Sequence, residues 1–187
     1  MRTKNKEVMK NIVSSAKKEF FTHGYLEASM RNIADEANIT PGNIYRYFES
    51  KEKLFDEIVH SVNKAISSLT KLENIVPSNV VLSSKGLVDY LIKTALDLAI
   101  KYKYETIILL SKSNGSKYED SVNNFIEFTA KSINKTRKDD NIDLSRVIAR
   151  SVIHTIMWIL EEYVDDESKI KELSIEYLKT IFSSHDD

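Results

Sequence analysis

The sequence predicts an all-α protein of about nine helices, and three observations support this fold class. Apolar residues recur at intervals of three and four positions along most of the 187 residues, which is the spacing of one helix face. No segment shows the sustained alternation of apolar and polar residues that a half-buried strand requires. With only 4 Gly and 2 Pro, the chain also has few of the turns that connect the strands of a β protein.

The first helix is predicted by an apolar i, i+4 stripe over residues 8–20. Gly24 is expected to end this helix, because glycine adopts left-handed backbone at little cost. Ser29 is suited to cap a second, short helix over residues 30–37. The chain therefore begins with one long and one short helix.

Thr40 as a cap, followed by Pro41 at the first helical position, predicts a third, short helix that reaches about residue 48. Ser50 is suited to cap a longer helix over residues 51–72. After a connection that contains a proline, helical spacing resumes over residues 84–100 and, after a bend at 102–104, continues to 111. Three further helices are predicted over residues 116–137, 143–164 and 170–182. Two of these helices have polar residues suited to their starts, a capping box at Ser116 and Glu119 and a cap at Asp143.

Charge is distributed unevenly along the chain. The formal net charge is only −1, but residues 1–53 hold 10 basic and 7 acidic side chains, whereas residues 54–187 hold 17 and 21. A basic N-terminal part followed by an acidic remainder is a modest indication of nucleic-acid binding. A solvated helix face is the ordinary alternative explanation of the basic side chains.

The segment over residues 29–53 gives the clearest indication of function. Two short helices lie here, joined at Asn38, a residue type that tolerates the left-handed backbone of a sharp turn. Ile33, Ala34 and Ala37 are small or apolar and allow the two helices to approach closely. This pattern predicts a helix-turn-helix, whose second helix enters the major groove of DNA.

The second helix of this motif carries side chains that suit contact with DNA. Thr40 and Asn43 can make hydrogen bonds, and Gly42 permits a close approach to the sugar-phosphate backbone. Arg46 is long enough to read a guanine with two hydrogen bonds or to contact a phosphate. Further hydroxyl and ammonium groups follow on Tyr45, Tyr47 and Lys51.

A longer pattern surrounds the motif and covers about residues 6–56. It consists of the runs Phe20-Phe21-x-x-Gly24-Tyr25, Ser29-Met30-x-x-Ile33-Ala34, Ala37-Asn38-Ile39 and Thr40-Pro41-Gly42-Asn43-Ile44-Tyr45-x-Tyr47-Phe48-x-Ser50-Lys51-Glu52-x-Leu54. In this pattern the chain resembles the TetR family of bacterial transcription regulators. The departures are small, with serine at position 29 where threonine is commoner and asparagine at 38 where glycine is commoner.

The resemblance implies a sequence-specific transcription regulator, and most simply a repressor, that binds double-stranded operator DNA. Residues 1–53 would form the DNA-binding domain, and residues 54–187 a helical domain for ligand binding and dimerisation, with the helix over 51–72 connecting the two. The residues implied to contact DNA are Ser29, Arg31, Thr40, Pro41, Gly42, Asn43, Tyr45, Arg46, Tyr47 and Lys51.

The resemblance also implies a homodimer formed through the last two long helices. Apolar residues between 147 and 160 cover more than one face of their helix, which is more than a helix covered on one side needs. A central core helix in a monomer is the alternative. The residues expected at the dimer interface are Val152, Ile156, Ile159, Leu160, Tyr177 and Ile181.

A small, mostly apolar effector is the remaining partner that the resemblance implies. Aromatic and amphipathic side chains of the second domain can form the walls of such a pocket, although plain core packing explains aromatic residues at helical spacing equally well. The candidates are Trp158, Phe125, His154, Phe128, Tyr104 and Tyr90.

Enzyme, metal and membrane functions find little support in the sequence. There is no Cys, the four His lie far apart in the chain, and neither a phosphate-binding glycine loop nor a G-x-S-x-G motif is present. We therefore expect no catalytic residue, no metal and no cofactor. The longest apolar run, residues 151–160, is too short to cross a bilayer, and the charged N-terminus does not resemble a signal peptide, so a cytoplasmic protein is expected.

Two other functions remain open from the sequence alone. The same fold can use its second domain to bind a protein partner instead of a small molecule. A helical enzyme that retains a vestigial DNA-binding motif is the other alternative.

Overall fold

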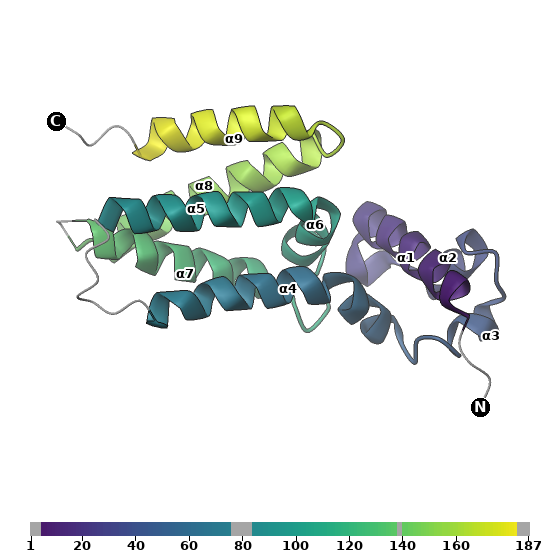
Figure 1. Ribbon diagram of the computed structural model, residues 1–187. Coiled ribbons are helices and arrows are strands. Elements are labelled where there is room, and N and C mark those ends of the chain that lie inside the picture. The colour runs from purple at the N-terminus through teal and green to yellow at the C-terminus, as the bar shows by residue number, and fades with distance from the viewer. Residues whose placement is uncertain (1–4, 76–83, 138–139, 183–187) are drawn as a thin grey trace. The chain divides into compact units, whose positions relative to one another are not determined.

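Figure 1 shows the computed structural model of the protein, in which residues 5–75, 84–137 and 140–182 are described, without the side chains of 70–75, 84–92 and 136. Over these ranges the chain is all-α, as the sequence predicts, and forms nine helices. They are α1 (Lys6–Glu27), α2 (Met30–Glu36), α3 (Pro41–Ile44), α4 (Lys51–Ile75), α5 (Ser84–Lys101), α6 (Lys103–Ser111), α7 (Ser121–Thr136), α8 (Ile142–Glu162) and α9 (Glu167–Phe182). The connection predicted around residue 77 lies outside the described residues.

The chain divides into two compact units. The first, called the head, comprises residues 1–63 together with 104–120, and the second, called the body, comprises residues 64–103 and 121–187. The head therefore includes most of α6 and the turns after it, although these lie far from the helix-turn-helix in the sequence. Helix α4 contributes its first half to the head and its second half to the body.

The core of the head forms along the predicted stripe of α1. Ile12, Ala16 and Phe20 are fully buried. Helix α1 is kinked at Gly24, whose φ of 71° and ψ of 171° lie outside the helical region, and the helix then continues to Glu27. Gly24 therefore kinks the helix, whereas the sequence predicted that it would end it. Directly after the kink, the Tyr25 amide donates to the Lys112 carbonyl oxygen at 2.8 Å.

Replacing Gly24 by Ala is expected to lower the free energy of unfolding of the head by about 1–3 kcal/mol, because the backbone conformation at this position is essentially restricted to glycine. Urea unfolding followed by circular dichroism measures the loss. The matched control is Gly42→Ala, where a Cβ would meet no atom within 4 Å and φ is ordinary. An equal effect of the two substitutions would contradict the strain argument.

The predicted start of α2 and the turn after it are confirmed. The Ser29 hydroxyl accepts from the Asn32 amide, and Asn38 has a φ of 56° in the left-handed region. Helix α3 has Thr40 at its N-cap position and Pro41 at its start, as predicted, but the Thr40 side chain makes no capping hydrogen bond. The helix is shorter than predicted, since residues 45–47 form turns with bonds such as that from the Tyr47 amide to the Ile44 carbonyl oxygen. Ser50 caps α4 as predicted, with its hydroxyl 3.1 Å from the Lys53 amide.

Two predicted helix starts are wrong. Ser116 and Glu119 form no capping box, because residues 116–120 are turns in which the Glu119 carboxylate accepts from the Gly115 amide. These turns pack against α4, where Tyr118 lies beside Phe55, and this contact competes with helix formation. Helix α8 is capped by Asn141, not Asp143, since the Asn141 side chain accepts from the Leu144 amide.

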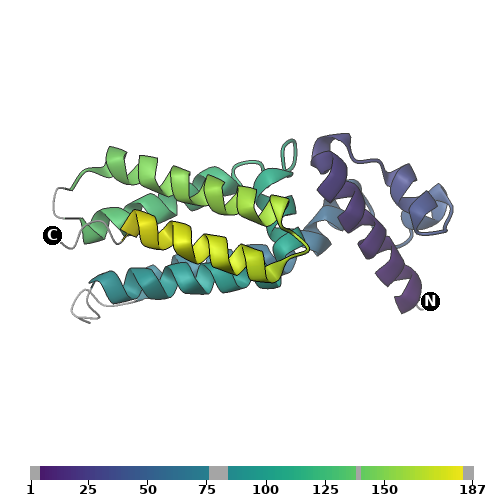
Figure 2. The same cartoon turned by 90° about the horizontal axis from the view of Figure 1, so that it is seen from above.

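The body is a bundle built mainly of α5, α7, α8 and α9. Helix α7 packs chiefly on α8, α8 on α9, and α5 on both α7 and α9. Figure 2 shows α8 (light green) and α9 (yellow) side by side. Buried apolar side chains of α7 and α8 fill the interior, among them Ile126, Ala130, Ala149, Ile153, Met157 and Leu160. Among the described residues, no helix combines the length and the apolarity needed to cross a bilayer.

Candidate nucleic-acid interface

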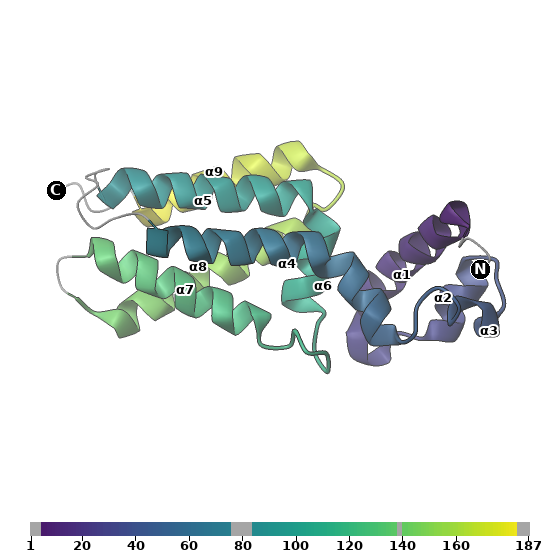
Figure 3. The same cartoon turned by 60° about the horizontal axis from the view of Figure 1, so that its bottom comes forward.

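The helix-turn-helix is formed by α2 and α3, which lie next to α1 in the head (Figure 3). Ile33, Ala34 and Ile44 are fully buried and close the corner between the two helices. After the left-handed Asn38, the Ile39 amide donates to the Ala34 carbonyl oxygen at 3.0 Å. Packing and backbone bonds together hold the two helices as one rigid element.

Most of the residues predicted to contact DNA present their side chains to solvent. Arg31, Thr40, Pro41, Gly42, Tyr45 and Arg46 are exposed, whereas Ser29, Asn43, Tyr47 and Lys51 are half-buried. Neither Arg31 nor Arg46 forms an ion pair with any carboxylate in the described part of the chain, so both guanidinium groups are available to an anion. The exposed set surrounds the start of α3, where the second helix of the motif would meet DNA.

Lys51 is engaged within the protein itself. Its Nζ atom donates to the Leu26 and Ala28 carbonyl oxygens, each at 3.1 Å. The same ammonium group lies 4.7 Å from the centre of the Tyr25 ring, within the range of a cation–π interaction. Lys51 thus binds the chain that connects α1 to α2.

Glu19 is a residue of this region that sequence reasoning missed. Its Oε1 atom accepts hydrogen bonds from the Ser29 amide at 3.0 Å and from Asn32 Nδ2 at 3.2 Å. The side chain is only 12% exposed. A carboxylate on α1 that accepts from the first residues of α2 cannot be recognised from sequence spacing, because the contact depends on how α1 and α2 pack.

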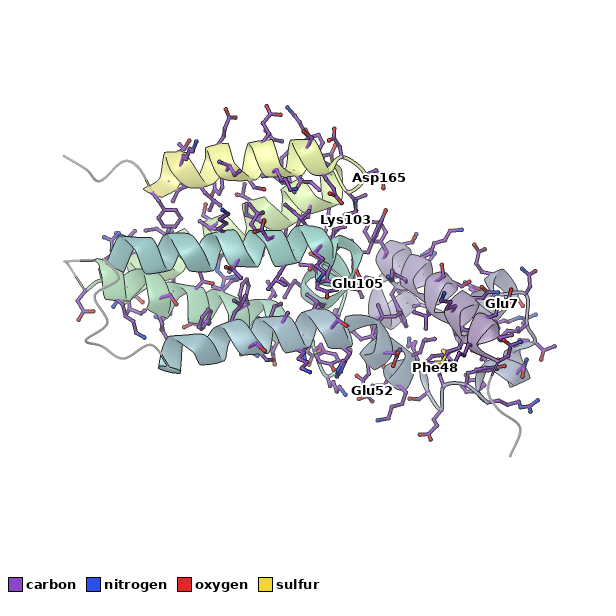
Figure 4. All side chains as sticks on the ribbon, viewed as in Figure 1. Glu7, Phe48, Glu52, Lys103, Glu105 and Asp165 are labelled. Atoms are coloured by element: carbon purple, nitrogen blue, oxygen red, sulfur yellow. The ribbon has the colours of Figure 1, made fainter. Side chains whose placement is uncertain are left out.

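The turns after α6 are joined to α4 by charged and aromatic side chains. Lys117 Nζ lies 2.7 Å from an Asp56 oxygen and 3.7 Å from one of Glu52, which is labelled in Figure 4. The hydrogen bond to Asp56 raises the pKa of Lys117 above its ordinary value. Burial raises the pKa of Tyr25 and of Tyr118, and nearby carboxylates add to both shifts, so both phenols stay neutral at physiological pH.

The predicted ligand-binding residues do not form one cluster. Phe125 and Phe128 are stacked on α7 with ring centres 6.4 Å apart. Tyr104 belongs to the head, where it packs edge-on against Phe21 at 5.4 Å. The side chain of Tyr90 lies outside the described residues.

The other two candidates, Trp158 and His154, are exposed on α8. Trp158 is 56% exposed, and its ring meets Tyr163 edge-on at 6.2 Å. These two residues share one face of α8 with Leu144, Val147 and Ser151, because the five positions are spaced three or four residues apart along the helix. We call this surface the outer face of α8.

The residues predicted at the dimer interface are mostly covered within a single chain. Val152, Ile159 and Leu160 are buried, and Ile156, Tyr177 and Ile181 are half-buried. Among the described side chains of the body, the large apolar ones that remain exposed are Leu144, Val147, Trp158 and Ile175. A hydrogen bond of 2.8 Å between the hydroxyls of Ser151 and Tyr177 joins the outer face of α8 to α9.

Comparison with known proteins identifies relatives of the N-terminal segment. Residues 12–58 match the family described as "Bacterial regulatory proteins, tetR family". The chain is 32% identical over 77 residues to the "Uncharacterized HTH-type transcriptional regulator YdgC" of Bacillus subtilis (strain 168). The matched segment covers 40% of each of the two chains. The chain is 40% identical over 47 residues to the "Probable acrEF/envCD operon repressor" of Escherichia coli (strain K12), which covers 25% of this chain and 21% of that protein. These matches thus span less than half the length of the curated relatives.

The fold of the whole chain has solved counterparts. A crystal structure of a TetR-family transcriptional regulator from Bordetella parapertussis 12822 superposes with a TM-score of 0.72 at 17% sequence identity. The superposition covers 98% of this chain and 97% of that one. At this identity the likeness concerns the arrangement of the helices in both units.

Proposed function

Because the chain belongs to the TetR family of helix-turn-helix transcription regulators, which are not enzymes, we propose that it is a repressor that binds operator DNA as a homodimer. The single observation that carries this proposal is the exposed set of polar side chains around the start of α3, held on a buried corner. The similar Escherichia coli protein, which is named as a probable operon repressor, supports repression as the direction of control. We further propose that the protein acts in the cytoplasm and that an effector releases it from DNA.

The proposed DNA contacts divide into two groups. Arg46, Asn43 and Tyr45 are suited to base edges in the major groove, with Arg31 as a further candidate from α2. The second group is suited to contact the sugar-phosphate backbone and consists of Ser29, Thr40, Pro41, Gly42 and Tyr47. Such contacts orient the protein on the duplex but do not select the base sequence. Two heads related by a twofold axis would bind half-sites about 34–36 Å apart, one turn of the double helix.

Replacing Arg46 by Ala is expected to lower the affinity for a selected duplex by about 1–3 kcal/mol per head and to relax the choice of sequence. Fluorescence anisotropy measures binding to a duplex that the wild-type protein enriches from a random pool, and to a scrambled duplex. Lys131→Ala, which removes an exposed cation from α7 of the body, is the matched control. An equal loss on both duplexes would instead make Arg46 a phosphate contact, and no loss on either would remove it from the interface.

The dimer is proposed to form through the outer face of α8 and the adjoining exposed part of α9. A dimer interface buries side chains that are exposed in the single chain. Val147, Trp158 and Ile175 are exposed in this way and are therefore favoured as the centre of the contact. Ile156, Tyr177 and Ile181 are half-buried and can contribute at its edge. Val152, Ile159 and Leu160 then support the interface from beneath by packing α8 within the body.

The effector is proposed to bind in the body beside Phe125 and Phe128, whose stacked rings offer a wall to a small, mostly apolar molecule. The chain passes between body and head within α4 and at both ends of residues 104–120. A change in the body can therefore reach the head through three covalent connections. Titration of the DNA complex with candidate apolar compounds tests this proposal, whereas release by a protein alone would favour the protein-docking alternative.

A further inference from the structure

Residues 26–29, which comprise the end of α1 and its connection to α2, are held by two side chains of opposite charge. Glu19 accepts from the Ser29 amide at 3.0 Å. Lys51 donates to the carbonyl oxygens of Leu26 and Ala28, both at 3.1 Å. A carboxylate thus accepts from one backbone N–H group of this segment, and an ammonium group donates to two of its carbonyl oxygens.

Both side chains are suited to fix this connection in one conformation. Hydrogen bonds that involve a charged partner are stronger than bonds between neutral groups, and three of them converge on residues 26–29. Glu19 is largely shielded from water, and it also accepts from the Asn32 side chain on the first turn of α2. The Lys51 ammonium lies over the Tyr25 ring, which restricts it further.

The conformation of this connection decides how the helix-turn-helix is presented. Helix α2 begins at Met30, one residue after Ser29. Because α2 and α3 are joined through Ile33 and Ile44, the conformation of residues 26–29, together with the packing of α2 on α1, sets the direction of both helices within the head. A head in which this angle varies would present α3 to the major groove only part of the time.

We propose that Glu19 and Lys51 are positioning residues for operator binding, and we call the pair the corner clamp. The Lys51 ammonium serves the carbonyls of residues 26 and 28 instead of a DNA phosphate. This inference rests on the proposed function as a DNA-binding regulator. It differs from the role that the family resemblance implies for Lys51, and the two roles predict different dependences on salt.

The first test replaces Glu19 by Ala. Removal of an acidic side chain from a DNA-binding head should strengthen binding, or leave it unchanged, if charge alone matters. The clamp predicts the opposite, a loss of about tenfold in affinity for the selected duplex, which corresponds to one charge-assisted hydrogen bond. Glu19→Gln keeps the acceptor oxygen without the charge and should fall between Ala and wild type.

The second test replaces Lys51 by Met, which keeps the length of the side chain and removes the ammonium group. The clamp predicts a loss of affinity of about tenfold with an unchanged slope of log affinity against log salt, because the number of neutralised phosphates stays the same. Lys51→Arg restores the donor groups and should restore most of the affinity. A slope that falls by about 0.9, the value for one lost phosphate contact, would overturn the assignment.

The matched control is Glu36→Gln, which removes the same charge from the head. Glu36 forms an exposed ion pair with Lys18, not with residues 26–29, so its loss should not weaken binding. The double variant Glu19→Ala with Lys51→Met should lose little more than the weaker-binding single variant, because both substitutions release the same connection. Fully additive losses would mean that the two side chains act independently.

Amide hydrogen exchange of each free protein is measured beside these DNA titrations. Glu19→Ala should raise exchange at Ser29 while the buried amides of α1 keep their protection, which shows that the head remains folded. If the wild-type protein enriches no duplex from a random pool, the proposed function and this inference both fail. If the wild type binds and both single variants match it in affinity, the inference alone fails.

Discussion

Replacing Val147 by Glu is expected to separate the proposed dimer into monomers and to lower operator affinity by about 10²–10⁴-fold. Val147 is 64% exposed on the outer face of α8, so the carboxylate stays in water and costs little in the folded monomer. In the dimer two unpaired carboxylates would be brought out of water near a twofold axis, which is strongly unfavourable. The loss of operator affinity is large because a monomer binds with one head only. In a dimer, binding of the first head holds the second at a high local concentration near its half-site.

Analytical ultracentrifugation at micromolar concentration and anisotropy with the selected duplex measure the two effects of this substitution. The matched control is Asn124→Glu, which adds the same charge at an exposed position of α7 in the same unit. It should remain dimeric and bind DNA as the wild type does. A Val147→Glu protein that stays dimeric would exclude the outer face of α8 as the interface, and a wild type that is monomeric would exclude the dimer itself.

Replacing Phe55 by Ala is expected to destabilise the head by about 3–5 kcal/mol, the usual cost of removing a buried aromatic ring. Phe55 is fully buried, and its ring centre lies 5.0 Å from that of Phe20 and 5.0 Å from that of Tyr25. It also contacts Tyr118 on the turns after α6, at 6.0 Å. Because small domains have only about 5–15 kcal/mol of stability, most of the reserve of the head would be lost.

Amide hydrogen exchange distinguishes this local effect from general unfolding. The amides of α1 and of the first half of α4 should lose protection by a factor corresponding to the lost stability, while those of α7 and α8 in the body should keep theirs. Leu26→Ala, which truncates an exposed side chain of the same unit, is the control and should cost about 1 kcal/mol or less. Equal loss of protection in head and body would contradict the division of the chain into two units.

The elements that the sequence predicts well depend on residues close together in the chain. The stripe of α1, the cap at Ser29 and the left-handed turn at Asn38 each involve side chains within four residues of one another. Local sterics and hydrogen bonding favour these conformations before any tertiary contact forms. The helix-turn-helix could be recognised for this reason.

The errors lie where tertiary contacts compete with local preference. Ser116 and Glu119 have the spacing of a capping box, yet residues 116–120 form turns because Lys117 pairs with Asp56 and Tyr118 packs on Phe55. The kink at Gly24 has a similar origin, since the Tyr25 amide bonds the Lys112 carbonyl instead of continuing the helix. Partners that lie about 60 or 90 positions away cannot be found from local spacing.

The two faces of α8 illustrate the same limit. Its apolar side chains cover more than one face, and the sequence alone offered Val152 and Leu160 for the dimer contact and Trp158 for a pocket. Packing of α7 and α9 against α8 buries the first two and leaves Trp158 exposed. Which side of an apolar helix faces solvent depends on the positions of its neighbours.

The helical fold class and the helix-turn-helix follow from the amino-acid sequence, because periodicity, capping and turn chemistry are local properties. Three other features depend on tertiary packing: residues 104–120 belong to the head, the outer face of α8 stays exposed, and Glu19 and Lys51 hold the segment before α2. These features arise when segments distant in the chain bury their apolar faces together and bring charged groups to the backbone atoms left unpaired between helices.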